Sequence, residues 1–118
     1  MLIIQASNEK NKGNLDKALQ LYYLSLKQGG NPAAVHYEIA QLEYSKNRDY
    51  EKALKHINAS LSLDESNKWY IFFYLKINEE NGHLNLVENG YDKLLSLYPN
   101  NIDYYMQLTD FYISQKQY

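Results

Sequence analysis

The middle of the chain reads Asn67-Lys68-Trp69-Tyr70-Ile71-Phe72-Phe73-Tyr74-Leu75-Lys76-Ile77, an almost unbroken apolar and aromatic run. It is far shorter than the roughly 18 apolar residues that a membrane-spanning helix needs, and Lys68 and Lys76 flank it. We therefore expect a buried core segment and no membrane insertion. With Asn67 as N-cap and Gly82 as the stop, the run fits a helix of about fourteen residues. A helix that is apolar on nearly every side must be covered by protein on several sides.

Length and composition limit the classes of protein to consider. The 118 residues suit one domain, and 45% hydrophobic with 22% charged residues is typical of a globular chain. The net charge is -2 and the basic residues are scattered, so we expect no nucleic-acid partner. The absence of cysteine excludes disulfides, thiolate zinc sites and cysteine catalysis. The first residues, Met1 to Gln5, lack the features of a secretory signal, and the localisation stays unknown, cytoplasmic or periplasmic.

Tyrosine is the most unusual component, with thirteen copies against three phenylalanines and one tryptophan. A tyrosine packs its ring while its hydroxyl keeps a polar partner or water. So many half-buried rings indicate long, thin layers of structure and not one thick core.

The chain before the central run is helical in pattern. Its apolar residues recur at spacings of three and four, which is typical of one face of a helix; these residues are Leu15, Ala18, Leu19, Tyr22 and Leu26. We expect Asn14 to cap this helix and Gly29-Gly30 to end it. Asn31-Pro32 then predicts the start of the next helix, because proline is tolerated at the first helical position.

An internal repeat follows from two independent registers. The segment 49–54 echoes the segment 14–19 at an offset of 35 residues, and a weaker copy follows after another 34 residues. The preceding helices repeat as well, in the dipeptides Ile39-Ala40, Tyr74-Leu75 and Leu108-Thr109. The single extra residue is placed in the turn around Asn47-Arg48, where insertions are tolerated.

A period near 34 residues with two helices per unit is typical of one repeat family. The chain resembles tetratricopeptide repeat (TPR) proteins over essentially its whole length. The matching motifs are Gly13-Asn14-Leu15 through Ala18, Tyr22 and Leu26; Ile39-Ala40 with Asp49 to Ala53; and Asn81-Gly82 through Leu95 with Pro99-Asn100-Asn101. The chain departs from the family pattern at three kinds of position. The tryptophan position near the start of each first helix holds His36, Ile71 and Tyr105. In the third pair, the small-residue position holds Val87, and Gly90 interrupts the second helix. We expect the third repeat to be the least regular.

The resemblance implies an all-α fold, a right-handed α-solenoid of antiparallel helix pairs with about seven helices. It implies a single domain over 1–118, with repeats near 1–32, 33–67, 68–101 and a partial one at 102–118. Small Ala18 and Ala53 let the two helices of a pair approach closely, and Tyr22 and Ile57, one turn later, fill the wedge between pairs.

Catalytic signals are weak. His36, His56 and His83 form no i, i+4 pair, and the adjacent carboxylates Glu79-Glu80 and Asp64-Glu65 point apart. There is no glycine-rich phosphate loop, nucleophile elbow or calcium loop. We therefore expect no enzyme activity, no metal site and no cofactor.

The resemblance places the binding surface on a concave groove lined by the first helix of each pair. The implied positions are Ala34, Tyr37, Gln41 and Tyr44 from the second repeat; Trp69, Phe72, Lys76 and Glu79 from the third; and Asp103, Met106, Asp110 and Ile113 from the last helix. Exposed tryptophan and tyrosine often dominate binding energies, so we expect a protein- or peptide-binding module with an aromatic-lined groove. The structural interpretation is that Trp69 and Phe72 belong to the core.

One known function of the family finds no support in these residues, and two other possibilities stay open. One subset of the family holds the carboxylate-ended tail of a chaperone through Lys and Asn side chains, but the corresponding positions here are Tyr37, Gln41, Phe72 and Lys76, which do not support that function. The alternative to an external partner is a structural or regulatory repeat segment whose groove is filled by a larger parent chain. We also predict self-association through Leu108, Phe111 and Tyr112, which would lack a covering helix.

Overall fold

The computed structural model describes residues 1–116, and in that range the chain forms seven helices and no strand. This confirms the predicted all-α architecture. The helices are α1 (Leu2–Asn11), α2 (Leu15–Lys27), α3 (Pro32–Ser45), α4 (Tyr50–Leu63), α5 (Lys68–Glu80), α6 (Leu84–Leu97) and α7 (Ile102–Gln115).

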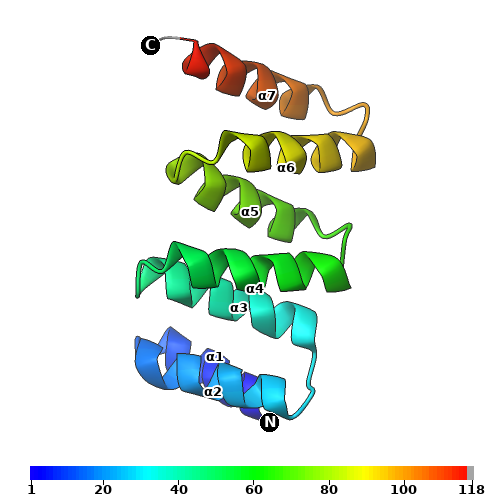
Figure 1. Cartoon of the computed structure of the whole chain (residues 1–118). Helices are drawn as coiled ribbons and strands as arrows, with labels where there is room; N and C mark the ends of the chain where they lie inside the picture. Colours follow the sequence, from blue (N-terminus) through cyan, green and yellow to red (C-terminus); the bar gives the residue numbers. More distant parts are fainter. Residues whose placement is uncertain (117–118) are drawn as a thin grey trace.

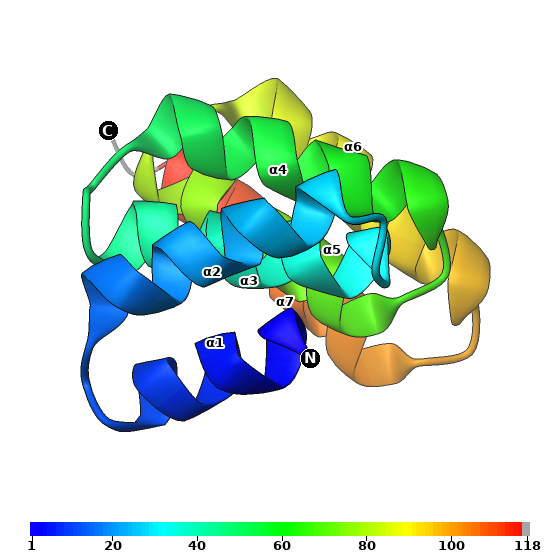
Figure 2. The same ribbon diagram turned by 90° about the horizontal axis from the view of Figure 1, so that it is seen from below.

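Consecutive helices run antiparallel and stack into an elongated array (Figure 1). The two termini lie at opposite ends of the stack, and the molecule measures 45 × 29 × 21 Å. Seen from one end, α2, α4 and α6 form one layer and the first helices of the pairs form the other (Figure 2). The array is therefore a solenoid in which each helix pair contacts only its neighbours.

The predicted repeat positions occupy equivalent surroundings. Ala18, Ala53 and Val87 each lie in the first half of a second helix, and all three are fully buried. One turn later, Tyr22 and Ile57 are also fully buried, as the wedge-filling role requires. The repeat register read from the sequence is thus the register of the packing.

Helix α5 is the centre of the stack. Seven of its residues are buried because α3, α4 and α6 all pack against it. It begins one residue after Asn67, whose side-chain oxygen accepts hydrogen bonds from the backbone N–H groups of Trp69 (3.0 Å) and Tyr70 (3.3 Å). It ends just before Gly82, which takes a positive φ of 74°. Both predicted boundaries of the central helix are confirmed.

Two other predicted N-cap residues lie at the predicted positions but do not make the predicted capping hydrogen bond. Asn14 and Asn31 occupy N-cap positions, but neither side chain accepts a hydrogen bond from its helix. Asn14 instead donates to the Glu9 carboxylate at 2.8 Å, and Asn31 adopts a left-handed φ of 33° that turns its side chain away from the capping geometry. Asp49 and Asn101 do cap their helices through Lys52 N–H and Tyr104 N–H.

Gly90 lies inside an unbroken α6, so it does not interrupt the helix. A Cβ atom at this position would lie 2.6 Å from Leu75 Cδ2 and 3.2 Å from Tyr74 Cδ1. Glycine is therefore required for the close approach of α6 to α5. It supplies the small volume that Val87, one turn earlier, does not.

The tyrosine hydroxyls join one helix to another. The interhelical donors and acceptors are Tyr23 with Glu43 (2.6 Å), Tyr44 with Glu80 (2.6 Å), Tyr50 with Asn78 (2.5 Å) and Tyr91 with Glu79 (3.2 Å). Each ring packs between layers while its hydroxyl finds a polar partner, which is the arrangement that the composition indicated.

The C-terminal helix is covered more than the sequence suggested. Phe111 is 8% exposed because its ring packs against that of Tyr91 on α6, with centroids 6.3 Å apart. Leu108 is half-buried against the same core, and only Tyr112 of the predicted trio is exposed. The prediction that Phe111 lacks a covering helix is therefore wrong.

Candidate functional site

We call the nine predicted groove residues on α3, α5 and α7 the first-helix face. They are Tyr37, Gln41, Tyr44, Trp69, Phe72, Lys76, Asp103, Met106 and Asp110. The structure gives these residues different degrees of exposure, and it separates those that hold helices together from those that are open to a partner.

The α3 members belong mainly to the packing between α3 and α5. The Tyr37 ring lies 4.8 Å from that of Tyr70 and 6.1 Å from that of Phe73, centroid to centroid. Tyr44 meets Phe73 edge-on and donates a hydrogen bond to Glu80. Burial raises the pKa of both tyrosine hydroxyls. Both rings are half-buried, so only part of each ring is accessible to a partner.

The α5 members are the most open aromatic group. Trp69 is 60% exposed, which excludes the core interpretation for this residue. Its ring rests edge-on against Phe72 at 5.7 Å, and the Lys68 ammonium lies 5.3 Å from its centroid. Phe72 is half-buried and packs against the core, so it lies between the Trp69 ring and the core.

The α7 members are exposed. Met106 is 58% exposed, and Asp103 and Asp110 are also open to solvent. A flexible thioether adapts to irregular apolar partners, whereas the two carboxylates add negative charge beside it.

A pocket of about 360 Å³ joins α5, α6 and α7 on this side. It brings the predicted Phe72 and Lys76 together with Glu79, which the helical spacing also placed on this face. It adds three residues that sequence reasoning missed: Leu75, Tyr91 and Gln107. Gln107 follows Met106 directly, and its position in the pocket depends on the rotation of α7, which the helical spacing does not fix.

The pocket carries one group of each charge. Tyr91 donates to the Glu79 carboxylate at 3.2 Å, and burial together with that carboxylate raises the pKa of Tyr91 to about 12. The Lys76 side chain, one turn before Glu79 on the same helix, is exposed and also lines the pocket. The pocket therefore combines an apolar floor with one cation, one anion and an amide.

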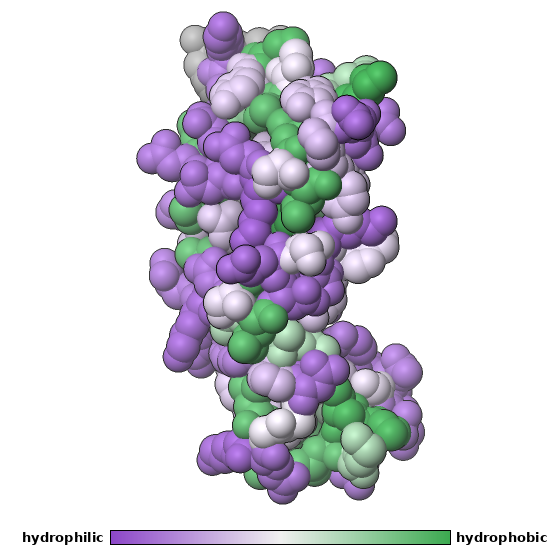
Figure 3. Space-filling view, turned by 90° about the vertical axis from the view of Figure 1, so that its right-hand side faces the viewer, coloured by the Kyte–Doolittle hydropathy of each residue, from purple (hydrophilic) through white to green (hydrophobic). Residues whose placement is uncertain are grey.

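Exposed apolar side chains occur on several helices of the stack. On the side shown in Figure 3 they alternate with hydrophilic ones along the length of the stack. No helix within residues 1–116 is long and apolar enough to cross a membrane. Over the same residues no group of three or more histidine or acidic side chains is placed to hold a metal ion.

Two of the histidines meet, which sequence spacing did not predict. The Nδ1 atoms of His36 on α3 and His56 on α4 are 2.8 Å apart, and the Tyr23 hydroxyl lies 3.4 Å from His56 Nε2. His56 is only 7% exposed, so the cluster forms part of the packing between the first two repeats.

Comparison with known proteins supports the fold. No family model and no curated protein matches the sequence. Three similar solved structures all contain TPR units. The first TPR of Spaghetti (RPAP3), solved with the HSP90 peptide SRMEEVD, has a TM-score of 0.77 at 17% identity, covering 97% of this chain and 90% of that one.

The other two structures extend the comparison. A TPR protein from Parabacteroides merdae has a TM-score of 0.77 at 19% identity, over 87% of this chain and 40% of that one. The C-terminal TPR domain of a putative FK506-binding protein from Plasmodium falciparum has a TM-score of 0.72 at 20% identity, covering 98% and 89%. The chain therefore has the TPR fold, a stack of antiparallel helix pairs.

Proposed function

We propose that the chain binds a polypeptide segment on the first-helix face, with Trp69 as the main anchor. The observation that carries the proposal is the 60% exposure of Trp69 where it rests on Phe72, on the helix that also lines the pocket holding Lys76 and Glu79. Covering a large exposed ring removes apolar surface from water and so makes binding more favourable. Trp is also enriched among the residues that dominate binding energies.

The surroundings of Trp69 favour a peptide ligand. An apolar side chain of the partner would cover the indole, while Lys76 and Glu79 would pair with polar or charged groups of the segment. Tyr37 and Tyr44 would line the second-repeat end of the same path. A neighbour with this fold was solved with a peptide bound, which supports a peptide as the class of ligand.

Trp69 is the only tryptophan in the chain, so its fluorescence reports occupancy of this face directly. The experiment selects binders from a random displayed peptide library and measures one labelled binder by fluorescence anisotropy. Trp69→Ala is expected to weaken binding by about 2 kcal/mol, roughly 30-fold, with unchanged helicity by circular dichroism.

Leu24→Ala is the matched control, because Leu24 is 43% exposed on α2, outside the first-helix face. It should leave the affinity unchanged. If the selected peptides bind Trp69→Ala as well as the wild type, the proposal is wrong.

A second candidate function keeps the same surface but supplies the occupant from a longer polypeptide. The Parabacteroides neighbour supports it, because the match covers only 40% of that chain, so similar repeats occur within longer proteins. In that case Trp69 emission in the longer polypeptide would already be shifted and would not respond to added peptide. A concentration-dependent shift favours the external partner instead.

Self-association is the remaining part of the partner proposal. The outer side of α7 exposes Ile102, Tyr105, Met106, Tyr112 and Ile113. Two copies could cover this surface for each other. Sedimentation should then show a mass that rises with concentration and a loss of association in Ile113→Glu. A constant monomer mass for the wild type at high concentration would refute the pairing.

A further inference from the structure

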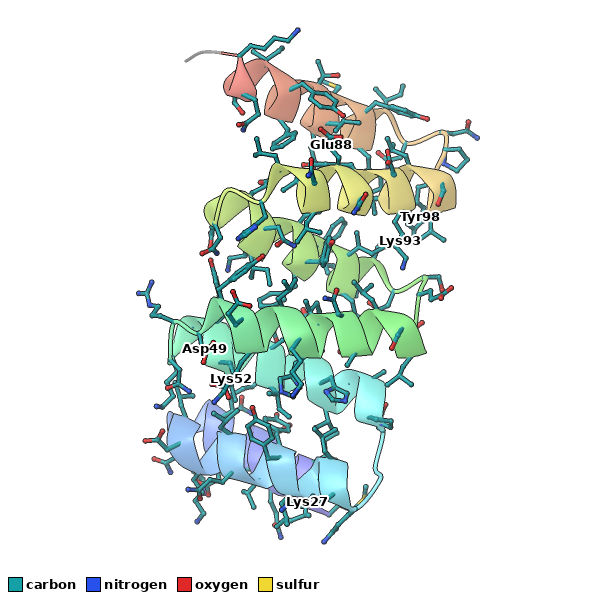
Figure 4. The ribbon with its side chains drawn as sticks, in the orientation of Figure 1. Lys27, Asp49, Lys52, Glu88, Lys93 and Tyr98 are labelled. Atoms are coloured by element: carbon teal, nitrogen blue, oxygen red, sulfur yellow. The ribbon has the colours of Figure 1, made fainter. Side chains whose placement is uncertain are left out.

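A second pocket lies on the other side of the stack, between α4, α5 and α6. Its volume is about 300 Å³. Its floor is apolar, formed by Leu61, Ile71 and Tyr74, which are 7%, 1% and 9% exposed. Gly90 lines it as well, and Asn58 and Lys93 stand on its rims. In Figure 4 the Lys93 side chain extends from α6 in the direction of α4. None of these six residues belongs to the first-helix face.

The preceding repeat shows what fills this space elsewhere in the same molecule. In the repeat register, Asn58, Ile71 and Gly90 correspond to Tyr23, His36 and His56. Those three side chains are rings packed on one another, with centroids 5.6 Å apart for Tyr23 and His56 and 5.0 Å apart for His36 and His56. Where the first junction holds aromatic rings, the second junction holds an amide, an aliphatic chain and no side chain at all.

The second junction cannot fill the space from α6. A Cβ atom at position 90 would lie 2.6 Å from Leu75 Cδ2, so the space beside Gly90 is already taken by α5 and a side chain there would require Leu75 to move. Asn58 is exposed and too short to cover the floor. The opening is therefore covered neither from position 58 nor from position 90.

The rims of the pocket carry polar groups without partners. The side chains of Asn58 and Asn89 line it from α4 and α6, and neither makes a hydrogen bond to another residue in the range 1–116. Each amide offers a donor and an acceptor, the pair of groups that a peptide backbone requires. Lys93 likewise forms no ion pair with the residues that the structure describes.

We infer that this pocket receives an aromatic side chain from a partner polypeptide, whose ring takes the place that Tyr23 fills at the first junction. The ring lies on Leu61, Ile71 and Tyr74. The backbone on either side of it bonds to the amides of Asn58 and Asn89. This surface is separate from the first-helix face, so a partner can occupy one without the other.

The test uses the capped tripeptides acetyl-Gly-Tyr-Gly-amide and acetyl-Gly-Leu-Gly-amide as probes. Binding is followed in ¹H–¹⁵N correlation spectra through the backbone amide of Gly90, one of only five glycines in the chain. The tyrosine peptide should give a saturable shift of the Gly90 signal, and the leucine peptide should bind roughly tenfold more weakly. Equal affinities for the two peptides, or no saturable shift, would overturn the inference without any variant.

A variant tests the location. Asn58→Tyr restores the residue of the first junction, so it fills the pocket from α4 and should reduce the affinity for the tyrosine peptide by roughly tenfold or more. Asn85→Tyr is the matched control, because Asn85 is exposed on α6 and does not line this pocket. It should bind as the wild type does. Unchanged binding in Asn58→Tyr overturns the inference.

A third arm separates a polypeptide from a small aromatic compound. 4-Methylphenol has the ring of tyrosine but no backbone to meet Asn58 and Asn89. Weaker binding than the tripeptide supports a polypeptide occupant. Equal binding assigns the pocket to a free aromatic compound and overturns the assignment to a polypeptide.

Discussion

The Nδ1 atoms of His36 and His56 face each other at 2.8 Å across the boundary between α3 and α4. One shared proton satisfies this pair, whereas a proton on each nitrogen would create repulsion. Burial, the neighbouring His36 and Lys55 lower the pKa of His56 to about 4, and burial with Lys55 lowers that of His36. Lys52 also lowers the pKa of His56, whereas Glu43 raises it. The balance keeps both rings neutral at pH 7.

We predict that acid weakens the fold through His56. The unfolded chain binds more protons than the folded chain between the ordinary histidine pKa of about 6.5 and the folded value near 4, so stability falls as pH falls through that window. The loss should be about 1–3 kcal/mol, measured as urea unfolding midpoints at pH 7 and pH 5.

His56→Gln should flatten this dependence, because a neutral amide takes up no proton. The control is His83→Gln, since His83 is exposed on the connection before α6. The two variants distinguish the buried pair from a general effect of histidine. The same pH slope in wild type and His56→Gln would contradict the assignment.

Gly90→Ala should destabilise the protein although alanine is the better helix former. The propensity gain is about 1 kcal/mol, but the methyl group overlaps Leu75, and overpacking of this kind costs about 1–3 kcal/mol. Gly30→Ala is the matched control, because its added Cβ would meet only Ser25 Oγ at 3.7 Å. Thermal unfolding of the two variants provides the comparison, and a Gly90→Ala protein more stable than the wild type would refute the close-approach argument.

Tyr50→Phe should cost about 1–3 kcal/mol, because it removes the donor to the carbonyl oxygen of fully buried Asn78. The Asn78 amide nitrogen is already bonded to the Tyr74 carbonyl at 2.8 Å, so the side chain is held in place and its oxygen stays unpaired. Tyr112→Phe removes the same atom from an exposed ring and should change stability by less than about 0.5 kcal/mol. Denaturant unfolding that gives equal effects at both positions would argue against a structural role for the Tyr50 hydroxyl.

The peptide SRMEEVD, bound by the Spaghetti neighbour, should not bind this chain specifically. Its acidic groups would meet Tyr37, Gln41 and Phe72, with Lys76 as the only cation among the corresponding positions. Titration with SRMEEVD should leave the Trp69 emission unchanged, and so should titration with a scrambled peptide of the same composition. A saturable change seen with SRMEEVD alone would show that the face recognises the acidic tail after all.

Most of the architecture could be predicted because it depends on local spacing. Ala18, Ala53 and Val87 fix the register through a constant offset of 34 to 35 residues, and Asn67 and Gly82 fix the two ends of the central helix. The caps at Asn14 and Asn31 failed because capping depends on a backbone conformation that residue type alone does not determine.

The site was predictable only in outline. The family resemblance, together with helical spacing, placed Trp69, Phe72 and Lys76 on one face, but the position of Tyr91 and Gln107 in the pocket depends on how α6 and α7 are rotated against α5. The contact between His36 and His56 likewise spans two helices, so no sequence spacing reveals it. Phe111 is buried because the Tyr91 ring on α6 packs against it. That contact depends on how α6 and α7 pack together, which the spacing of residues within one helix does not reveal.

Helix α3 takes part in two separate apolar cores. Val35, Ile39 and Leu42 face the core shared with α1 and α2, whereas Ala40 joins the larger one that extends to α7. Because α3 contributes side chains to both cores, one substitution in this helix can disturb the packing of the first repeat and that of the later repeats together.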